Sequence, residues 1–226
     1  MLLYNIMKRD EFIEILTILQ KEYYKWQAPA TKLAKHYGYN RTPYTILISA
    51  LLSSRTKDET THAAAHRLFA IADTPQKMVN VSRETIEQAI YPVGFYKQKA
   101  LFILRLSHEL LQNYGGKVPD SLDELVKLPG VGIKVAKIVL EKAFNRPYIA
   151  VDAHIARLCK LWGIAKNAKE CDEKLQEFVP DSMKIGCNQI LVSFGQAICR
   201  VKKPQCQICP IKSKLESFGI ECMITA

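Results

Sequence analysis

A glycine-rich turn, Pro129-Gly130-Val131-Gly132, joins two short segments with helical apolar spacing, and Lys134 lies two residues after it. Ser121 and Glu124 are spaced as a capping box at the start of the first segment. Glycines let a backbone approach phosphate closely, and the N–H groups at the start of the second helix favour an anion. The pattern therefore predicts a helix-hairpin-helix with a phosphate-binding turn.

A second motif, Val151-Asp152-Ala153-His154, places Asp152 eighteen residues after Lys134. Together the two motifs resemble the endonuclease III family of DNA glycosylases, in which the hairpin reads roughly L-P-G-V-G-x-K and is followed by V-D-x-H. The resemblance extends over residues 47–209. The hairpin alone is less specific than the pair of motifs, because many non-enzymatic DNA-binding proteins carry it.

The resemblance implies that Lys134 is a catalytic nucleophile and that Asp152 assists it. The implied enzyme is a bifunctional DNA glycosylase and AP lyase that excises oxidised pyrimidines during base excision repair. A lysine amine that attacks the sugar C1′ forms a Schiff base, which permits β-elimination of the 3′ phosphate. From residue types alone, Lys134 is one of 32 basic residues that could contact phosphate, and Asp152 is a natural N-cap. A helical wheel places Lys134 at the edge of the buried face and Lys137 toward solvent.

Two other segments resemble the loops with which this family probes DNA. Arg55 occupies the position that meets the orphaned partner base, and arginine there is also seen in the family's archaeal-type branch. A guanidinium can stack on a base or donate two hydrogen bonds to it. Phe95, in Pro92-Val93-Gly94-Phe95-Tyr96, resembles an apolar wedge. The alternatives are a phosphate contact for Arg55 and a core position for Phe95. The hairpin residues assigned to DNA binding are Leu128, Gly130, Val131 and Gly132.

Cysteines near the C-terminal end have the spacing C-x6-C-x2-C, which matches the family's [4Fe–4S] loop; they are Cys199, Cys206 and Cys209. Leu215 stands where the family has its fourth cysteine, and the next cysteine is Cys222. We expect Cys222 to complete the cluster through a longer closing segment, because such clusters usually need four thiolates. A structural zinc site and the absence of a metal are the alternatives.

The 226-residue chain has a formal net charge of +10. An excess of positive charge favours a polyanionic partner, here double-stranded DNA with a damaged base or an abasic site. Between the cysteines, a basic loop is expected to present Arg200, Lys202 and Lys203 to phosphates. No segment approaches the roughly 18 apolar residues of a membrane span, and no secretion signal is evident. We therefore expect a monomer without a membrane partner, located in the cytoplasm and associated with the nucleoid, with its seven cysteines reduced or metal-bound.

Apolar spacing predicts about ten helices and no strands, so the expected fold class is all-α. The clearest helices are an amphipathic one over 8–24 capped by Asp10, a buried one over 45–53, and long ones over 96–114 and 183–198. Asp58, Thr74 and Ser82 mark further helix starts. The resemblance adds two helical domains flanking a DNA groove. A six-helix barrel with the hairpin would cover 36–146, and a discontinuous domain would combine 1–35 with 147–226 and end in the cysteine loop.

Three other functions are possible on these observations. Mismatch-specific glycosylases share the scaffold, although their hairpin usually lacks this lysine. A non-catalytic helix-hairpin-helix module would bind DNA without needing Lys134 or Asp152. A basic iron–sulfur redox protein would not need the hairpin.

Overall fold

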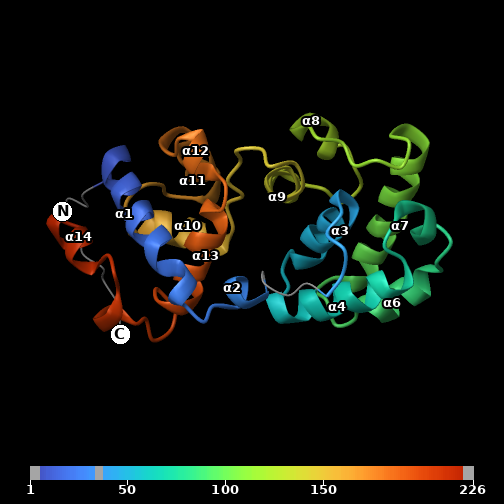
Figure 1. The fold of residues 1–226 in the computed structure, drawn as a ribbon, viewed down its shortest axis with the longest axis horizontal. Coiled ribbons are helices and arrows are strands. Elements are labelled where there is room, and N and C mark those ends of the chain that lie inside the picture. Colours follow the sequence, from blue (N-terminus) through green and yellow to red (C-terminus); the bar gives the residue numbers. More distant parts are fainter. Residues whose placement is uncertain (1–5, 34–37, 221–226) are drawn as a thin grey trace. The chain divides into compact units, whose positions relative to one another are not determined.

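The computed structural model describes residues 6–33 and 38–220, and every regular element within them is a helix (Figure 1). The all-α prediction is therefore confirmed. The chain divides into two compact units: unit 1 is Met1–Lys32 with Pro147–Ala226, and unit 2 is Leu33–Arg146. Among the helices described, none combines the length and the apolar character that crossing a membrane requires.

Unit 2 is organised around a buried helix, α3. Its helices are α3 (Pro43–Ser53), α4 (Asp58–Ile71), α5 (Pro75–Met78), α6 (Arg83–Ile90), α7 (Tyr96–Asn113), α8 (Leu122–Leu125) and α9 (Ile133–Phe144). α3 packs against α4, α7 and α9. Its side chains Leu47, Ile48 and Leu52 are completely buried, as the nearly continuous apolar sequence predicts.

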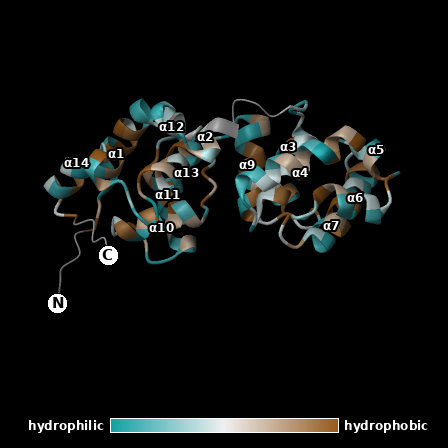
Figure 2. Cartoon of the chain, turned by 90° about the horizontal axis from the view of Figure 1, so that it is seen from below, coloured by the Kyte–Doolittle hydropathy of each residue, from teal (hydrophilic) through white to brown (hydrophobic). Residues whose placement is uncertain are grey.

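Unit 1 is built on the contacts of α13 with α1, α10 and α12. Its helices are α1 (Arg9–Glu22), α10 (Ala153–Leu161), α11 (Ala168–Phe178), α12 (Asp181–Lys184), α13 (Cys187–Ala197) and α14 (Lys212–Ser217), and α2 (Pro29–Leu33) ends at its boundary in the sequence. Two 3₁₀ turns cover Tyr23–Lys25 and Cys206–Ile208. Trp162 lies 6.2 Å from Phe12 and 6.1 Å from Phe194 between ring centroids. Figure 2 shows α1 with both hydrophobic and hydrophilic stretches, which is typical of a helix packed on one side.

Short polar side chains begin several helices where the sequence predicts. Thr74, Ser82 and Ser121 each accept a hydrogen bond from the backbone N–H three residues later. Asp10 and Asp58 are not N-caps, because both lie within the first turn of their helices. A carboxylate in the first turn is still favourable, since it faces the positive end of the helix dipole.

The predicted single helix over 183–198 is wrong. α12 ends at Lys184 and α13 begins at Cys187, and Gly186 between them has a φ of +80°. Glycine adopts this left-handed conformation without a steric penalty, so the helix axis is interrupted there. The segment after Cys209 is also not simply a loop, because it contains α14.

Candidate nucleic-acid interface and cysteine pocket

The hairpin predicted from the sequence is formed by α8, the turn 126–132 and α9. Ser121 Oγ accepts from the backbone N–H of Glu124 at 3.3 Å and caps α8. The Glu124 carboxylate accepts from Lys127 Nζ at 2.5 Å and from the Tyr114 hydroxyl at 2.9 Å. Both donors lower the pKa of Glu124. The first helix of the hairpin is therefore anchored to the end of α7.

The two glycines of the turn have different structural roles. Gly130 has a φ of +79°, and a Cβ there would lie 2.7 Å from the Phe102 ring. Gly132 is exposed, and a Cβ there would meet nothing within 4 Å. The side chains of Leu128 and Val131 are buried, so only their backbone groups can reach a ligand. The turn therefore presents backbone to the surface, mainly at Gly132.

Lys134 lies in the first turn of α9 and is exposed. Its neighbour Ile133 is 60% exposed. The first N–H groups of a helix have no intrahelical acceptor, so this end of α9 is suited to bind an anion. Lys137 does not point to solvent as the helical wheel predicts, because it is only 5% exposed. Glu141, one turn later, is equally buried, so a second face of α9 is covered in addition to the apolar one.

Asp152 is the N-cap of α10, in unit 1. Its Oδ1 accepts from the Ile155 backbone N–H at 2.9 Å, and the residue is half-buried. One carboxylate oxygen is thus used to begin the helix. Asp152 therefore does cap α10, and its second carboxylate oxygen remains available for another contact.

Arg55 and Phe95 lie on two loops of unit 2 and meet at their tips. The Arg55 guanidinium carbon is 5.4 Å from the centroid of the Phe95 ring, a separation typical of cation–π contact. Phe95 is 61% exposed, which excludes a core position. Both residues have positive φ, 52° and 58°, and this conformation is uncommon for residues other than glycine.

Two basic residues that the sequence does not single out, Lys99 and Arg67, bind backbone oxygens at the bases of these loops. Lys99, in the first turn of α7, is buried and donates to three oxygens around the end of α3. Burial lowers the pKa of Lys99 to about 8. Arg67, on α4, donates to Ala89 O at 2.8 Å and to Tyr91 O at 2.5 Å, where α6 ends. Neither residue belongs to a sequence motif that marks it among the other lysines and arginines.

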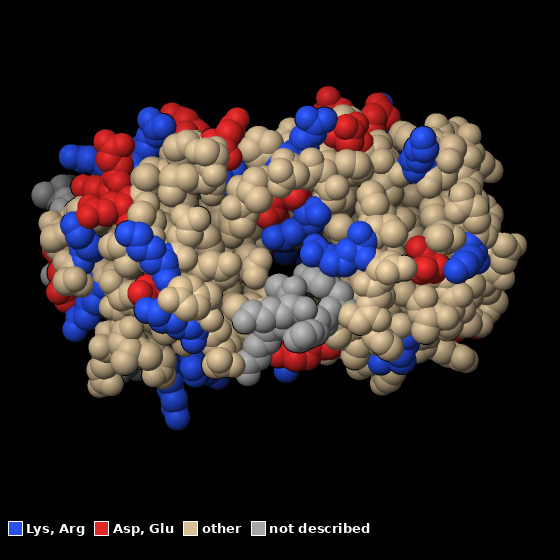
Figure 3. Space-filling model, in the orientation of Figure 1, with Lys and Arg blue, Asp and Glu red and all other residues tan. Residues whose placement is uncertain are grey.

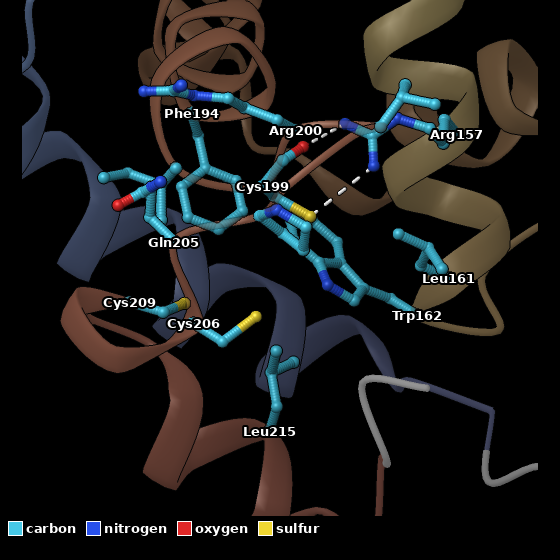
Figure 4. A pocket seen from close by; sticks show the side chains of 13 residues that line it. Arg157, Leu161, Trp162, Phe194, Cys199, Arg200, Gln205, Cys206, Cys209 and Leu215 are labelled. Atoms are coloured by element: carbon cyan, nitrogen blue, oxygen red, sulfur yellow. Dashed lines mark hydrogen bonds between the residues drawn. The ribbon is translucent and has the colours of Figure 1, made fainter. Parts of the chain in front are cut away.

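Three of the four predicted cluster ligands line one pocket of unit 1, which has a volume of about 180 Å³. They are Cys199, Cys206 and Cys209, and Leu215 from α14 lines the same pocket (Figure 4). Cys222 lies outside the described residues. Burial raises the pKa of the Cys209 thiol, and the neighbouring Cys199 and Cys206 raise it further.

Arg157 of α10 points toward Cys199 in the pocket (Figure 4). Its Nη1 is 3.5 Å from Cys199 Sγ, and its Nη2 donates to Cys199 O. Its buried Nε has no hydrogen-bond partner within the described part of the chain, although such a group normally has one. The pocket thus combines three thiols with one guanidinium, that of Arg157, which still has an N–H donor that no described residue uses. This chemistry suits an anionic group that contains sulfur.

The expected basic loop is exposed, and its first residue, Arg200, lines this pocket. Arg200, Lys202 and Lys203 all lie on the surface, and Lys203 has a φ of +53°. Figure 3 shows lysine and arginine side chains on both units, with acidic side chains among them.

Comparison with known proteins identifies the family of the chain. Residues 48–181 match the family model described as "HhH-GPD superfamily base excision DNA repair protein". Endonuclease III of Thermotoga maritima is 38% identical over 194 residues, which cover 84% of this chain and 91% of that protein. That of Escherichia coli is 35% identical over 212 residues, covering 93% and 97%.

Solved structures give the same result. The fold matches a non-covalent endonuclease III–DNA complex with a TM-score of 0.83 and 29% identity, covering 95% of this chain and 98% of that one. It also matches a trapped endonuclease III–DNA covalent intermediate with a TM-score of 0.82 and 30% identity, covering 94% and 100%. The chain therefore belongs to the HhH-GPD superfamily of base excision DNA repair proteins and, within it, to the endonuclease III family.

Proposed function

We propose that this protein is a bifunctional DNA glycosylase and AP lyase that excises oxidised pyrimidines from double-stranded DNA in base excision repair. The observation that carries the proposal is an exposed lysine, Lys134, in the first helical turn after an open glycine turn. A backbone phosphate held by the turn would place a nearby sugar within reach of that lysine.

In the proposed reaction, the neutral Lys134 amine attacks C1′ of the damaged nucleoside. The N-glycosidic bond breaks, the base leaves with the bonding electron pair, and it takes up a proton. The C1′–O4′ bond then opens, O4′ takes up a proton, and the lysine nitrogen forms a protonated Schiff base with C1′, which acidifies the C2′ protons. Loss of one C2′ proton then breaks the C3′–oxygen bond, so the strand is cut on the 3′ side of the lesion.

Asp152 is proposed to accept the proton from Lys134 and to stabilise positive charge that develops on the sugar. Its function as an N-cap can be separated from this role. An asparagine at this position would cap α10 about as well as the aspartate does, but it carries no charge. Asp152→Asn should therefore retain thermal stability and lose excision activity, whereas Asp152→Ala should lose about 1 kcal/mol of stability as well.

The test of the proposed function is a borohydride trap on a duplex with one oxidised pyrimidine. We expect a covalent protein–DNA adduct that is absent in Lys134→Ala. Lys142→Ala is the matched control, because Lys142 lies on the same helix but is paired with Glu141 at 2.9 Å. An adduct on an abasic site alone would retain the lyase and change the substrate. No adduct on either DNA would contradict the proposal.

Arg55 and Phe95 are proposed to fill the space left by the flipped base and to probe its partner. Their exposed tips and their mutual contact support this role. The basic residues Arg200, Lys202 and Lys203 are proposed to bind backbone phosphates. DNA affinity should therefore fall steeply as salt rises, and equal affinity at low and physiological salt would contradict this contact.

We propose that Cys199, Cys206, Cys209 and Cys222 hold a [4Fe–4S] cluster, and that the cluster stabilises the fold and takes no part in the reaction. The pocket supports the first three ligands. Cys222 follows Ile220 by two residues, and the Ile220 N–H donates to Leu215 O at 2.8 Å. Ile220 is therefore bonded beside Leu215, which lines the pocket. Iron and acid-labile sulfide should both fall in Cys222→Ala; unchanged contents would exclude Cys222 as a ligand.

A mismatch-specific glycosylase is the second candidate, favoured by Arg55, which can donate two hydrogen bonds to a guanine. Excision assays with each opposite base distinguish the two functions. A non-catalytic DNA-binding module would give DNA affinity without an adduct. The location in the cytoplasm with the nucleoid and the monomeric state stay predictions.

A further inference from the structure

Lys99 is a buried cation that contacts uncharged oxygens. Only 6% of the residue is exposed. Its Nζ donates to Leu52 O at 2.8 Å, to Ser54 O at 2.6 Å and to Thr56 Oγ1 at 3.3 Å. These contacts use all three N–H groups of the ammonium. Because none of the three acceptors is a carboxylate, these contacts do not form an ion pair that would explain a lysine at this position.

The acceptors belong to the end of α3 and to the loop that carries Arg55. Carbonyl groups in the last turn of a helix lack intrahelical donors, and the negative end of the helix dipole favours a cation there. A single ammonium can satisfy Leu52 O and Ser54 O together, and it fixes the direction in which the chain leaves α3. Lys99 thereby determines where the Arg55 loop begins.

Thr56 extends this contact to the second loop. Its Oγ1, which accepts from Lys99, also accepts from the Gly94 N–H at 3.2 Å and donates to Ser54 O at 3.2 Å. The loops approach so closely that a Cβ on Gly94 would lie 2.6 Å from Arg55 O. Lys99 itself follows the second loop, and its backbone N–H donates to Phe95 O at 3.0 Å. One residue therefore contacts both loops.

The residues at the tips of the loops need such support. Arg55 and Phe95 both have left-handed backbone conformations, which persist in non-glycine residues only where the surroundings impose them. Their side chains are exposed and contact each other, so the side chains add little burial that could impose the conformation. The contacts of Lys99 and Thr56 beneath them provide that constraint.

We propose that Lys99 is a positioning residue that holds the loops of Arg55 and Phe95 in one shared conformation for entry into duplex DNA, an inference that rests on the proposed function. Burial lowers the pKa of Lys99 to about 8, so at neutral pH the side chain is still mainly an ammonium with three donors. A neutral side chain of similar size could not satisfy the three oxygens.

The first test compares two reactions of Lys99→Met. Excision of an oxidised pyrimidine from a duplex needs the probing loops, whereas β-elimination at an abasic site in single-stranded DNA has no partner base to probe. We expect duplex excision to fall by roughly tenfold or more and single-strand elimination to stay within about twofold. Lys97→Met is the matched control, because Lys97 is exposed in the same turn of α7. Equal loss of both reactions, or an effect no larger than that of Lys97→Met, would overturn the proposal.

The second test needs no enzymatic activity. Hydrogen exchange of DNA-free Lys99→Met should accelerate at residues 53–56 and 93–96 and remain unchanged in α9. Thr56→Val, which removes the bridging oxygen, should accelerate the same segments. Unchanged exchange in both loops would overturn the proposal. If the wild-type protein cuts neither the oxidised duplex nor the single-stranded abasic DNA, the proposed function is contradicted. The hydrogen-exchange result then decides by itself whether Lys99 holds the two loops.

Discussion

Gly130 and Gly132 allow the stability of the hairpin and its DNA contact to be perturbed separately. A Cβ at Gly130 would lie 2.7 Å from the Phe102 ring, and the φ of +79° is unfavourable for any side chain. A Cβ at Gly132 would meet nothing within 4 Å, and its φ of −93° is ordinary. We therefore expect Gly130→Ala to destabilise unit 2 and Gly132→Ala to leave it folded.

The magnitudes follow from these two geometries. The left-handed conformation and the displacement of a packed ring together should lower the free energy of unfolding of Gly130→Ala by about 2–5 kcal/mol. For Gly132→Ala, alanine is a poorer N-cap than glycine, but it also reduces the entropy of the unfolded chain. These effects oppose each other, so the net change should stay within about 1 kcal/mol.

The assay must report on unit 2. Both tryptophans, Trp26 and Trp162, lie in unit 1, so urea unfolding should be followed by far-UV circular dichroism, with hydrogen exchange of α8 and α9 to locate the change. DNA affinity is then measured at fixed salt on folded protein. Gly132→Ala should weaken binding by roughly tenfold, because the added methyl group keeps a phosphate away from the turn.

The two variants provide each other's control. Equal unfolding free energies for Gly130→Ala and the wild type would refute the packing argument at Phe102. Unchanged affinity in Gly132→Ala would refute the assignment of the open turn to phosphate binding, even if the hairpin remained folded.

Three further predictions concern other parts of the chain. Because burial lowers the pKa of Lys99 from 10.5 to about 8, burying its ammonium costs stability below about pH 8, and this cost is removed as the pH rises to about 10.5. The wild type should therefore gain up to about 3 kcal/mol between these values relative to Lys99→Met, as measured by urea unfolding at both pH values. Arg67→Met leaves Ala89 O and Tyr91 O without their donor, so unfolding free energy should fall by about 1.5–3 kcal/mol; a change below about 0.5 kcal/mol, the level of a surface substitution, would contradict this. Leu215→Cys combined with removal of the fourth predicted thiol should restore iron content, as measured by metal analysis.

The sequence predicts those features of the fold that depend on local chemistry. Thr74, Ser82 and Asp152 each begin a helix where predicted, because their side chains satisfy backbone N–H groups three residues later. The interruption at Gly186 was missed because the apolar spacing continues through it, and only the backbone conformation reveals the break. The burial of Lys137 was missed because a helical wheel assumes a single covered face.

The candidate site likewise has parts that the local sequence predicts and parts that depend on tertiary packing. The hairpin and the cysteine spacing are sequential motifs, so they could be identified before the structure was known. The contact between Arg55 and Phe95, and the position of Lys99 beneath them, join segments 40 or more residues apart in sequence. Periodicity carries no information about such pairings. They depend on how α3 and α7 pack.

Helix α3 connects the proposed chemistry with the probing loops. α9, which carries Lys134, packs against α3, and Lys99 holds the carbonyl groups at the end of the same helix. Most residues of α3 are buried, so the helix cannot shift without opening a close-packed core. The separation of Lys134 from Arg55 is therefore set by a rigid element, while the loop conformation is set by Lys99. A change at Lys99 should consequently disturb the loops and leave Lys134 in place, which is why excision and elimination can be separated by experiment.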